Sequence, residues 1–522
     1  MSDVSVVVAG AGLVGSALAV ECGWRGIDCL VVDPRERTAS YEVAHPRAKL
    51  TNIRSMTHLR RWGIAERLRA LDPLPPEWPM RVLYTTSVTG PALGAFEEAF
   101  GGKVADDRFP ERAQWIPQPL VERVLRETAA AMPSVELRLG PRVSGWRDDG
   151  DAVEVDLDDG TTVRARFLVG CDGRRSTVRE GLGLRLEGQE NVLRGLGLVV
   201  RLEEELPDVP RAIQYWCIQP RWASMGGPLD DRGHWFVQTA IPEEMQPDGA
   251  PVGEIVRAFF GAEVAHQVLD VALWEADALI AERYRVRNVF LAGDAAHVHP
   301  PLGGHGMNLG IGDAVDLGWK LQAELDGWAG ARLLDTYEAE RRDAARRVVA
   351  AAMLNTRASD REALGAAMNG NRRHLAELIG SAKEPEFRSL GLVLGRRYEG
   401  SPIVAGEDGP PPIEETCSYV PTGRPGGLAP HAWLRDGASL YDRLGPGFTL
   451  LRLGAADTTP LEDAAATAGV PLAVVDPGDP ALSGLYGATL ALVRPDQHVA
   501  WRGDRLPDDP AALVDLVRGE AA

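Results

Sequence analysis

The sequence predicts an α/β protein whose main part is a Rossmann-like nucleotide-binding domain. Three glycine–acid segments, far apart along the chain, carry this prediction. They are Gly10-Ala-Gly12-Leu-Val-Gly15, Cys171-Asp172-Gly173 and Ala292-Gly293-Asp294. Each follows a short apolar run, at residues 4–9, 167–169 and 288–292, of the kind that forms a buried strand. Their order and spacing indicate one chain folded around a single bound cofactor.

The first segment has the glycines that a phosphate-binding turn needs. Gly10 allows the tight turn, Gly12 lets a phosphate approach the backbone, and Gly15 lets helix and strand pack closely. Leu13 and Val14 begin the helix, whose N-terminus offers free N–H groups and a positive dipole end to a pyrophosphate. The alternative is a tight strand–helix turn without a ligand. NAD and FAD bind in the same way, so this segment alone does not name the nucleotide.

An acidic residue follows where a ribose-binding group is expected. Residues 29–32 are an apolar run that ends at Asp33, 18 residues after Gly15. A carboxylate at this position accepts hydrogen bonds from ribose hydroxyls. Asp33 is therefore a candidate cofactor ligand.

The third segment continues into a glycine-rich loop and a helix. Five glycines lie within residues 303–312, and a helical pattern covers about residues 307–325. So many glycines are costly to order, which makes a solvated loop without a ligand the weaker alternative. The helix N-terminus directs N–H groups and a positive dipole end at whatever lies before it.

Around the second and third segments, the chain resembles the class A flavoprotein aromatic hydroxylases, typified by p-hydroxybenzoate hydroxylase. The resemblance rests on Gly170-Cys-Asp-Gly-Arg-Arg-Ser-Thr-Val-Arg179 and Gly293-Asp-Ala-Ala-His-Val-His-Pro-Pro-Leu-Gly-Gly-His-Gly-Met-Asn308, which follow the first segment in that family's order. It covers nearly the whole chain. Residues 430–518 also resemble the C-terminal domain of larger members, such as phenol, angucycline and indolocarbazole-pathway hydroxylases.

The resemblance implies that the cofactor is FAD. Asp294 would hold the ribityl chain, and Gln118 would contact the same region. Arg47 would reach the cofactor from the loop after the second strand, and Asp172 would lie near both FAD and the reduced pyridine nucleotide. Pro301 would sit beside the flavin ring, with the loop that follows it under the pyrimidine edge. The expected cofactor residues are Gly10, Gly12, Leu13, Val14, Gly15, Asp33, Arg47, Gln118, Asp172, Gly293, Asp294, Pro301, Gly304, Gly306, Met307 and Asn308.

Three domains are expected. A discontinuous FAD-binding domain would take residues 1–80, 106–182 and 283–400. Residues 81–105 and 183–282 contain short alternating runs and would form a mostly antiparallel sheet that roofs the flavin and binds the substrate. The expected substrate-binding residues, for which plain core packing is the alternative, are Tyr215, Trp216 and Trp235. No catalytic residue is named, although a His or Tyr within residues 185–281 is a candidate base.

Residues 413–522 are expected to form a small thioredoxin-like α/β domain. Apolar runs predict strands at residues 448–453, 472–475 and 488–493, and periodic stretches predict helices at residues 460–468 and 510–518. The Cys-x-x-Cys of redox thioredoxins is missing, because Cys417 is the only cysteine after residue 217. A structural or dimer-forming role is therefore expected, which allows a homodimer.

The composition is typical of a cytoplasmic enzyme. The net charge of −19 argues against nucleic acid and anionic membranes as partners. No stretch is long and apolar enough to span a membrane, and no signal peptide precedes the first strand. The five cysteines lack metal-binding spacing and are expected to be reduced thiols. His297, His299 and His305 lack the neighbouring acids or cysteines that would complete a site, so no metal is expected.

The sequence thus predicts an FAD-dependent monooxygenase that hydroxylates a phenolic or polycyclic aromatic substrate. By resemblance, NADPH or NADH reduces the flavin as a transient co-substrate, O₂ forms a C4a-hydroperoxide, and its distal OH passes to the ring. The tail favours large aromatic molecules of secondary metabolism. The alternatives are a flavin-dependent oxidase or epoxidase of the same fold, or a catalytically silent flavin-binding protein. A halogenase is disfavoured because its Trp-x-Trp-x-Ile-Pro segment is missing.

Overall fold

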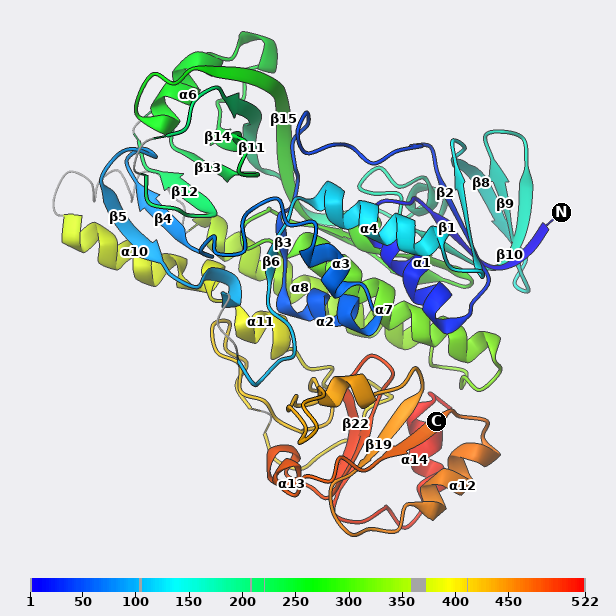
Figure 1. The fold of residues 1–522 in the computed structure, drawn as a ribbon. Coiled ribbons are helices and arrows are strands. Elements are labelled where there is room, and N and C mark those ends of the chain that lie inside the picture. Colours follow the sequence, from blue (N-terminus) through cyan, green and yellow to red (C-terminus); the bar gives the residue numbers. More distant parts are fainter. Residues whose placement is uncertain are drawn as a thin grey trace.

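The computed structural model describes residues 2–102, 106–206, 209–219, 221–357, 372–410 and 412–520. Its parts are two eight-stranded sheets and a four-stranded sheet, each with its own helices (Figure 1). The described helices include none that is both long enough and apolar enough to cross a lipid bilayer. Four of the five cysteines are buried, and all five are free thiols.

The first sheet has a parallel centre that confirms the predicted Rossmann-like fold. Its strand order is β16-β17-β10-β1-β2-β7, and β1 pairs in parallel with both β10 and β2. β9 and β8 extend from β10 in antiparallel fashion. The strand bounds are β1 Ser2–Ala9, β2 Cys29–Asp33, β7 Val135–Leu139, β8 Val143–Asp148, β9 Val153–Leu157, β10 Thr162–Gly170, β16 Arg285–Val286 and β17 Val289–Leu291.

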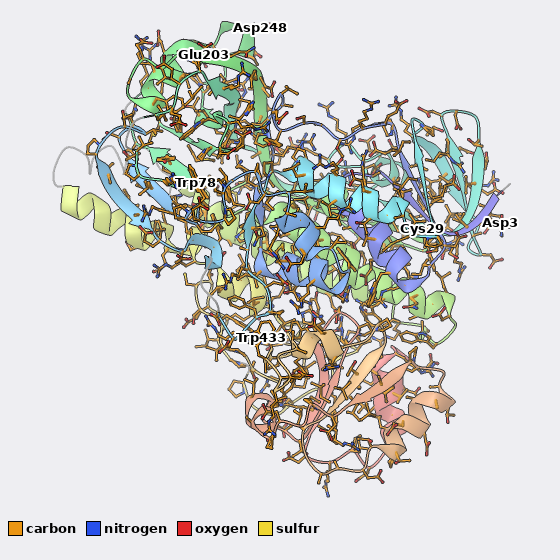
Figure 2. All side chains as sticks on the ribbon, in the orientation of Figure 1. Asp3, Cys29, Trp78, Glu203, Asp248 and Trp433 are labelled. Atoms are coloured by element: carbon orange, nitrogen blue, oxygen red, sulfur yellow. The ribbon has the colours of Figure 1, made fainter. Side chains whose placement is uncertain are left out.

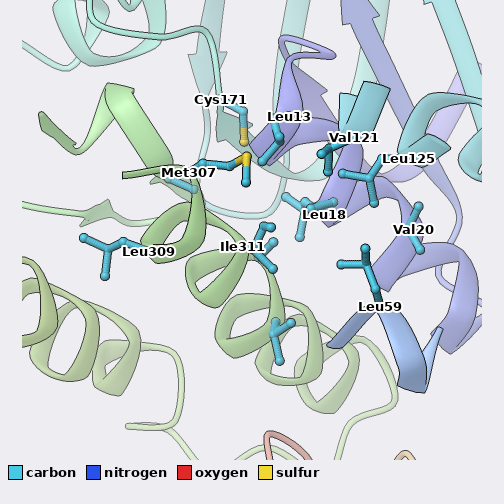
Figure 3. Close-up of a cluster of buried hydrophobic side chains, with 14 of the residues drawn as sticks. Leu13, Leu18, Val20, Leu59, Val121, Leu125, Cys171, Met307, Leu309 and Ile311 are labelled. Atoms are coloured by element: carbon cyan, nitrogen blue, oxygen red, sulfur yellow. The ribbon is translucent and has the colours of Figure 1, made fainter. Parts of the chain in front are cut away.

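Helices α1, α4 and α7 pack beside this sheet. α1 (Leu13–Arg25) ends at Gly26, whose φ of 75° is the left-handed conformation that favours glycine at a helix C-terminus. α7 (Gly306–Leu325) lies so close to α1 that a Cβ atom at Gly318 would be 2.4 Å from Glu21 Cγ. Figure 3 shows the apolar side chains of α1, α4 (Gln118–Ala130) and α7 meeting between the helices.

The second sheet is mostly antiparallel, as the sequence predicts, with the order β18-β15-β11-β14-β13-β12-β4-β5. Its long strands β11 and β15 run antiparallel along most of their length. α6 (Val252–Phe260) packs over one face of the sheet. The strand bounds are β4 Val82–Thr85, β5 Ala92–Phe96, β11 Leu186–Leu202, β12 Gln214–Cys217, β13 Ser224–Pro228, β14 His234–Ala240, β15 His266–Ala281 and β18 His297–Val298.

Smaller elements connect the two large sheets. β3 and β6 pair with each other, and α2 begins at a cap in which the Asn52 side chain accepts a hydrogen bond from Ser55 N. The chain after residue 350 contains the end of α8, then α10 and α11, and residues 358–371 lie outside the described residues. The bounds are β3 Leu50–Thr51, α2 Ile53–Arg61, α3 Ala65–Arg69, β6 Gln114–Trp115, α5 Thr177–Gly181, α8 Asp335–Arg357, α10 Arg372–Phe387 and α11 Leu390–Leu394.

The C-terminal unit contains a four-stranded sheet of order β20-β19-β21-β22, in which only β19 and β20 are parallel. The strands and helices predicted for this unit are confirmed to within about two residues. Their bounds are β19 Phe448–Arg452, α12 Thr459–Thr467, β20 Leu472–Val475, α13 Ala481–Tyr486, β21 Leu490–Val493, β22 Val499–Gly503 and α14 Pro510–Val517.

Aromatic contacts join the C-terminal unit to helices α7 and α2. Trp319 of α7 stacks on Trp328 with ring centres 6.3 Å apart and meets Phe448 of β19 edge-on. Trp433, labelled in Figure 2, lies on the side of this unit that approaches α2, and the Arg60 guanidinium is 5.9 Å from its ring centre. Helix α7 therefore contributes both to the hydrophobic core beside the first sheet and to the core of the C-terminal unit.

A buried charge network crosses the same interface. Arg494 lies after β21 with its side chain fully buried, 2.6 Å from Glu340 of α8 and 2.7 Å from Asp496. Lys320 of α7 is 2.7 Å from both Glu340 and Asp316. Because buried charges are tolerated only when paired, this network requires the C-terminal unit to dock in one orientation.

We expect Arg494→Met to destabilise the protein by about 3–5 kcal/mol, because it leaves buried carboxylates without their arginine. Denaturant unfolding followed by tryptophan fluorescence measures the change. Arg443→Met is the matched control, since Arg443 pairs with Asp436 at an exposed site and such pairs contribute about 1 kcal/mol or less. Equal unfolding midpoints for the two variants would contradict the proposed importance of the network.

Candidate functional site

The three glycine–acid segments meet at the carboxyl ends of β1, β10 and β17. Gly10 has a φ of 100°, and a Cβ atom there would lie 2.6 Å from the carbonyl oxygen of Cys171. A Cβ atom at Gly293 would lie 2.8 Å from Val14 Cγ2. The segments therefore touch through positions that have no side chain, which explains why glycine stands at each of them.

Gly15 and Gly12 have different surroundings. A Cβ atom at Gly15 would lie 1.8 Å from the carbonyl oxygen of Gly10, so the helix and the turn pack as closely as predicted. At Gly12 the nearest atom is Arg35 Nη2, at an ordinary contact distance of 3.5 Å. No described protein atom demands glycine at position 12, and the close approach of a phosphate, as the sequence analysis expects, would account for it.

Asp33 lies at the end of β2 beside this turn. Its carboxylate accepts hydrogen bonds from Ala11 N at 2.7 Å and from Arg35 N at 2.8 Å. Burial alone would raise the pKa of Asp33, but the hydrogen bonds from Arg35 and Ala11 outweigh it and hold the pKa below its ordinary value. Asp33 is thus ionised and orients the glycine turn, with the half-exposed Arg35 side chain over its outer side.

Two buried charged residues of α4 adjoin the same turn and were missed by the sequence analysis. Arg126 Nε donates to the carbonyl oxygen of Ala11 at 2.7 Å, while its Nη2 has no hydrogen-bond partner among the described residues. The same Nη2 forms an ion pair with the Glu122 carboxylate, 3.3 Å from its Oε1. Both follow Gln118 at intervals of four residues, so they share its helix face, and this spacing is the signal that could have found them.

Gln118 itself connects α4 to the loop that carries Arg47. Its Oε1 accepts a hydrogen bond from Ala48 N at 3.3 Å, and its own N–H donates to Ala48 O at 2.8 Å. Arg47 is exposed and has a φ of 57°, an uncommon conformation for a residue with a side chain. The structure thus brings Arg47 and Gln118 close in space, although they are 71 residues apart in the sequence.

Asp172 and Asp294 each present a carboxyl group to the space in front of the segments. Burial raises the pKa of both groups, and nearby positive charges of His297 and Arg47 oppose the shift at Asp294. The Asp294 side chain is exposed, although protein surrounds it closely enough for burial to raise its pKa. This combination is expected of a residue that lines an internal space. Asp172 Oδ1 finds no hydrogen-bond partner within the described part of the chain. Both groups are available to hydroxyl donors of a ligand.

The loop before α7 is held in a fixed shape. Gly304 has a φ of 66° and lies against Leu50, and Pro301 is exposed. The Asn308 side chain accepts from Asn52 N at 2.9 Å and donates to the carbonyl oxygens of Leu50 and Gly304 at 2.9 and 2.7 Å. Asn308 therefore fastens this loop to residues 50–52 with its side chain.

The first turn of α7 follows this loop. Gly306 begins the helix, and Met307 packs against the second segment. Figure 3 shows the sulfur-bearing ends of Met307 and Cys171 facing each other. The helix has no acidic residue in its first turn, so its N–H groups remain available to an anionic ligand.

Two histidines of the third segment, His297 and His299, have partners within the protein. His297 lies 2.7 Å from Asp313, which also accepts from Gly293 N at 3.0 Å and from Arg341 at 2.7 Å. Burial would raise the pKa of Asp313, but the charges of His297 and Arg341 hold it at about 2. His299 Nδ1 is 2.8 Å from the carbonyl oxygen of Pro300. Asp313 thus fixes the turn that carries Asp294.

The structure does not bring the three predicted substrate-binding aromatics together. Tyr215 and Trp235 pack against each other on the face covered by α6, with ring centres 5.7 Å apart, and the Tyr215 hydroxyl donates to Pro210 O. Trp216 lies on the opposite face, stacked on Tyr84 at 5.7 Å. We call this second face, which also carries Phe236, the inner face of the sheet.

The inner face adjoins the loop that carries Arg47. The His45 ring lies 2.8 Å from Gln238 of β14, and a Cβ atom at Gly197 of β11 would meet the same ring at 2.6 Å. His45 N donates to Asp270 of β15 at 2.8 Å. The sheet therefore lies directly over the loop beside the cofactor segments.

Comparisons with known proteins agree with this geometry. Residues 3–352 match the family described as FAD binding domain, and residues 422–519 match the family described as aromatic-ring hydroxylase, C-terminal. Aklavinone 12-hydroxylase RdmE of Streptomyces purpurascens is 35% identical over 99% of this chain and 98% of its own length. A 4-methyl-5-nitrocatechol 5-monooxygenase of a Burkholderia species is 33% identical over 99% of this chain and 97% of its own.

Solved structures match across the full length. The rebeccamycin biosynthetic enzyme RebC with reduced flavin superposes with a TM-score of 0.89 and 32% identity, covering 100% of this chain and 99% of that one. Aklavinone-11 hydroxylase, solved with FAD and aklavinone, gives a TM-score of 0.85 and 32% identity, covering 99% of both chains.

The chain belongs to the FAD-dependent aromatic-ring hydroxylases. It is an aromatic monooxygenase that uses FAD, with NAD(P)H as co-substrate. The residues present fit FAD: no described atom comes closer than 3.5 Å to a Cβ position at Gly12, Asp172 Oδ1 has no hydrogen-bond donor among the described residues, and the Asp294 side chain is exposed.

We expect Gly12→Ala to weaken FAD binding at least about tenfold, or about 1.4 kcal/mol, while the thermal stability of the apoprotein is unchanged. The backbone at Gly12 has a φ of −65°, which alanine adopts freely, so only the approach of the ligand penalises the new methyl group. Titration of the deflavinated protein with FAD, followed by flavin fluorescence, measures the affinity. Gly145→Ala in β8 is the matched control, because a Cβ atom there meets nothing within 4 Å. Equal FAD affinity in the two variants would overturn this role of Gly12.

Proposed function

We propose that the enzyme hydroxylates an electron-rich phenolic or polycyclic aromatic ring held between the inner face of the second sheet and the flavin, with NADPH or NADH as a transient reductant. The observation that carries the proposal is the meeting of three remote segments beneath a sheet with an aromatic inner face. The relatives' names add support, since they include aklavinone 12-hydroxylase RdmE, tetracenomycin B2 monooxygenase-dioxygenase and 4-methyl-5-nitrocatechol 5-monooxygenase, and a catechol is a phenol.

We further propose specific roles for the residues in front of the segments. The N-terminal turns of α1 and α7 would bind the pyrophosphate and the flavin edge through backbone N–H groups. Asp294 and Gln118 would hold the ribityl chain, Asp172 would serve the region where cofactor and pyridine nucleotide meet, and Arg47 would reach the cofactor from its loop. Arg126 would add a positive charge near the phosphates.

The bound flavin supplies the electron transfer and the oxygen chemistry. The chain's own task is to orient the aromatic ring and keep water away from the reacting atoms. The aromatic side chains of Phe236 and Trp216 on the inner face suit this task, and Gln238 adds a polar group on the same face. The negative charge of reduced flavin would be stabilised by the N-terminus of α7.

The division into three domains, at the boundaries expected from the sequence, belongs to this proposal. So do a cytoplasmic location and a homodimer. The Arg494 network, which links the C-terminal unit to α7 and α8, supports a structural role for that unit. Size-exclusion chromatography with light scattering tests the dimer.

We expect the purified protein to be yellow and to oxidise NAD(P)H faster when a suitable phenol or polycyclic phenol is added. NAD(P)H absorbance, oxygen consumption and mass spectrometry of the product measure the coupled reaction. The control is the same assay with the non-phenolic parent hydrocarbon. A broad panel of phenols, quinones and polycyclic aromatics that raises neither NAD(P)H consumption nor oxygenated product would count against the proposal.

We expect Trp216→Leu to raise the KM for the aromatic substrate about two- to tenfold, as the loss of one aromatic contact predicts, with a smaller change in kcat. Tyr215→Phe is the matched control, since Tyr215 is the neighbouring residue of β12 but lies on the opposite face. Steady-state kinetics at saturating NAD(P)H measure both constants. An unchanged KM in Trp216→Leu would remove this residue from the substrate site.

A further inference from the structure

Lysine is rare in this chain, which makes its few buried lysines informative. Among 56 Lys and Arg residues only four are lysines: Lys49, Lys103, Lys320 and Lys383. Lys103 lies outside the described residues, and the other three are buried. Because nearly every other cationic residue is arginine, lysine at these positions indicates a role that depends on its amine.

Two of the buried lysines have carboxylate partners. Lys320 is 2.7 Å from Asp316 and from Glu340, and Lys383 is 2.9 Å from Glu386. Lys49 forms no ion pair with any carboxylate of the described residues, and its Nζ donates to the carbonyl oxygen of Arg47 at 3.1 Å. An unpaired buried ammonium is expensive in a protein interior, so a partner from outside the chain is expected.

The groups around Lys49 are mainly aromatic. Its Nζ lies 3.8 Å from the ring centre of Phe236 on the inner face and 5.9 Å from that of Trp115 on β6. The titratable groups nearby are Arg47 and His45 of its own segment and Asp270 of β15, which accepts from His45 N. Burial lowers the pKa of Lys49 to about 7.

Burial also lowers the pKa of His45, to about 3, and the charges of Lys49 and Arg47 add to this shift. His45 is therefore neutral at physiological pH and does not compete as a cation. Lys49, which lies against Phe236 of the inner face, has a pKa brought close to neutrality by burial.

Lys49 precedes the residue that contacts the loop expected under the flavin. The next residue, Leu50, packs against Gly304, and its carbonyl oxygen accepts from Asn308 of α7 at 2.9 Å. Lys49 O accepts from Ile116 N at 2.7 Å, which fixes the backbone on the other side. The amine is thus held between the cofactor loop and the inner face, where the proposed function puts the aromatic ring.

We propose, on the basis of the proposed function, that Lys49 is the catalytic residue that accepts the hydroxyl proton of a phenolic substrate and then binds the phenolate as an ammonium. The phenolic O–H bond breaks, its electron pair stays on oxygen, and the proton forms a new N–H bond at Nζ. No oxidant or reductant takes part in this step. The phenolate ring is richer in electrons and more reactive towards an electrophilic oxygen.

Arginine cannot perform this step, because its guanidinium stays protonated in proteins. The His and Tyr residues of residues 185–281 are already engaged. His234 is 2.8 Å from Asp230, His266 is 2.8 Å from Val264 O, and the Tyr215 hydroxyl donates to Pro210 O on the outer face. Of these, the Asp230–His234 pair is the alternative base that the experiment must separate from Lys49.

The first experiment measures the ionisation of Lys49 in the FAD-loaded enzyme. With lysine labelled with ¹³C at Cε, at most four NMR signals arise, and Lys49→Met identifies the one of interest. We expect that signal to titrate near pH 7 and to move when 4-nitrophenol is added. If no lysine signal titrates between about pH 6 and 8, where ordinary lysines remain protonated, the proposal is wrong.

The same variant has a stability readout. Unfolded chains keep lysine protonated up to about pH 10, so below about pH 7 folding must desolvate an ammonium, and this cost falls as the pH rises from about 7 to about 10. Lys49→Met is therefore expected to raise the thermal unfolding midpoint at pH 7 and not at pH 10. A lower midpoint at pH 7 would mean that Lys49 is a stabilising structural residue.

The second experiment compares phenols of different acidity. With phenol itself, Lys49→Met and Lys49→Arg are both expected to lower kcat at least about tenfold at pH 7. At about pH 8, where 4-nitrophenol is already largely ionised, Lys49→Arg is expected to recover most of the rate with this substrate, because only the cation is still needed. Equal losses with both phenols, or a larger loss in His234→Gln, would assign the proton transfer elsewhere.

The two experiments separate failure of this inference from failure of the proposed function. If the wild-type enzyme hydroxylates no phenol, the proposed function fails, while the NMR and stability measurements still report on Lys49. If the wild-type enzyme hydroxylates phenols and Lys49→Met is equally active, the proposed function stands and the role of Lys49 is refuted.

Discussion

The fold depends on direct backbone contact between chain segments that are remote in sequence. The absent side chain at Gly10 lets the first segment rest on Cys171, and the absent side chain at Gly293 lets the third segment rest on Val14. Asp313 then fixes the third turn by accepting from Gly293 N and bonding His297. A methyl group at either glycine would separate the segments, so the site exists only in the assembled sheet.

Helix α7 connects these segments to the C-terminal unit. Its N-terminal turn follows the loop that Asn308 fastens to residues 50–52, and its C-terminal half carries Trp319 into the core of the C-terminal unit. The Arg494 network adds paired charges at the same boundary. A unit without redox cysteines therefore still contributes to the site, because it supports the helix that presents the cofactor loop.

The buried charged groups differ in how completely they are paired within the chain, and this difference bears on the chemistry of the site. Most buried charges here are satisfied within the chain, as Asp33, Asp313 and Lys320 show. Among the described residues, Asp172 keeps one carboxylate oxygen without a donor, Asp294 is exposed in front of the segments, and Lys49, next to the inner face, has no carboxylate partner. Polar groups that are incompletely satisfied within a protein are candidate contacts for a ligand, and the roles proposed above for Asp172, Asp294 and Lys49 rest on this contrast.

The sequence by itself determined the nucleotide-binding strands, the glycine turns and the C-terminal sheet, because apolar runs and glycine positions are local and are read within a few residues. It also indicated FAD through three segments in one order. Only the tertiary structure decided that Trp216 and Tyr215 face opposite sides of β12, that Arg126 reaches Ala11, and that Lys49 lies under Phe236 without a carboxylate. The physical reason is that exposure, pairing and pKa depend on neighbours from distant parts of the chain, which no local pattern specifies.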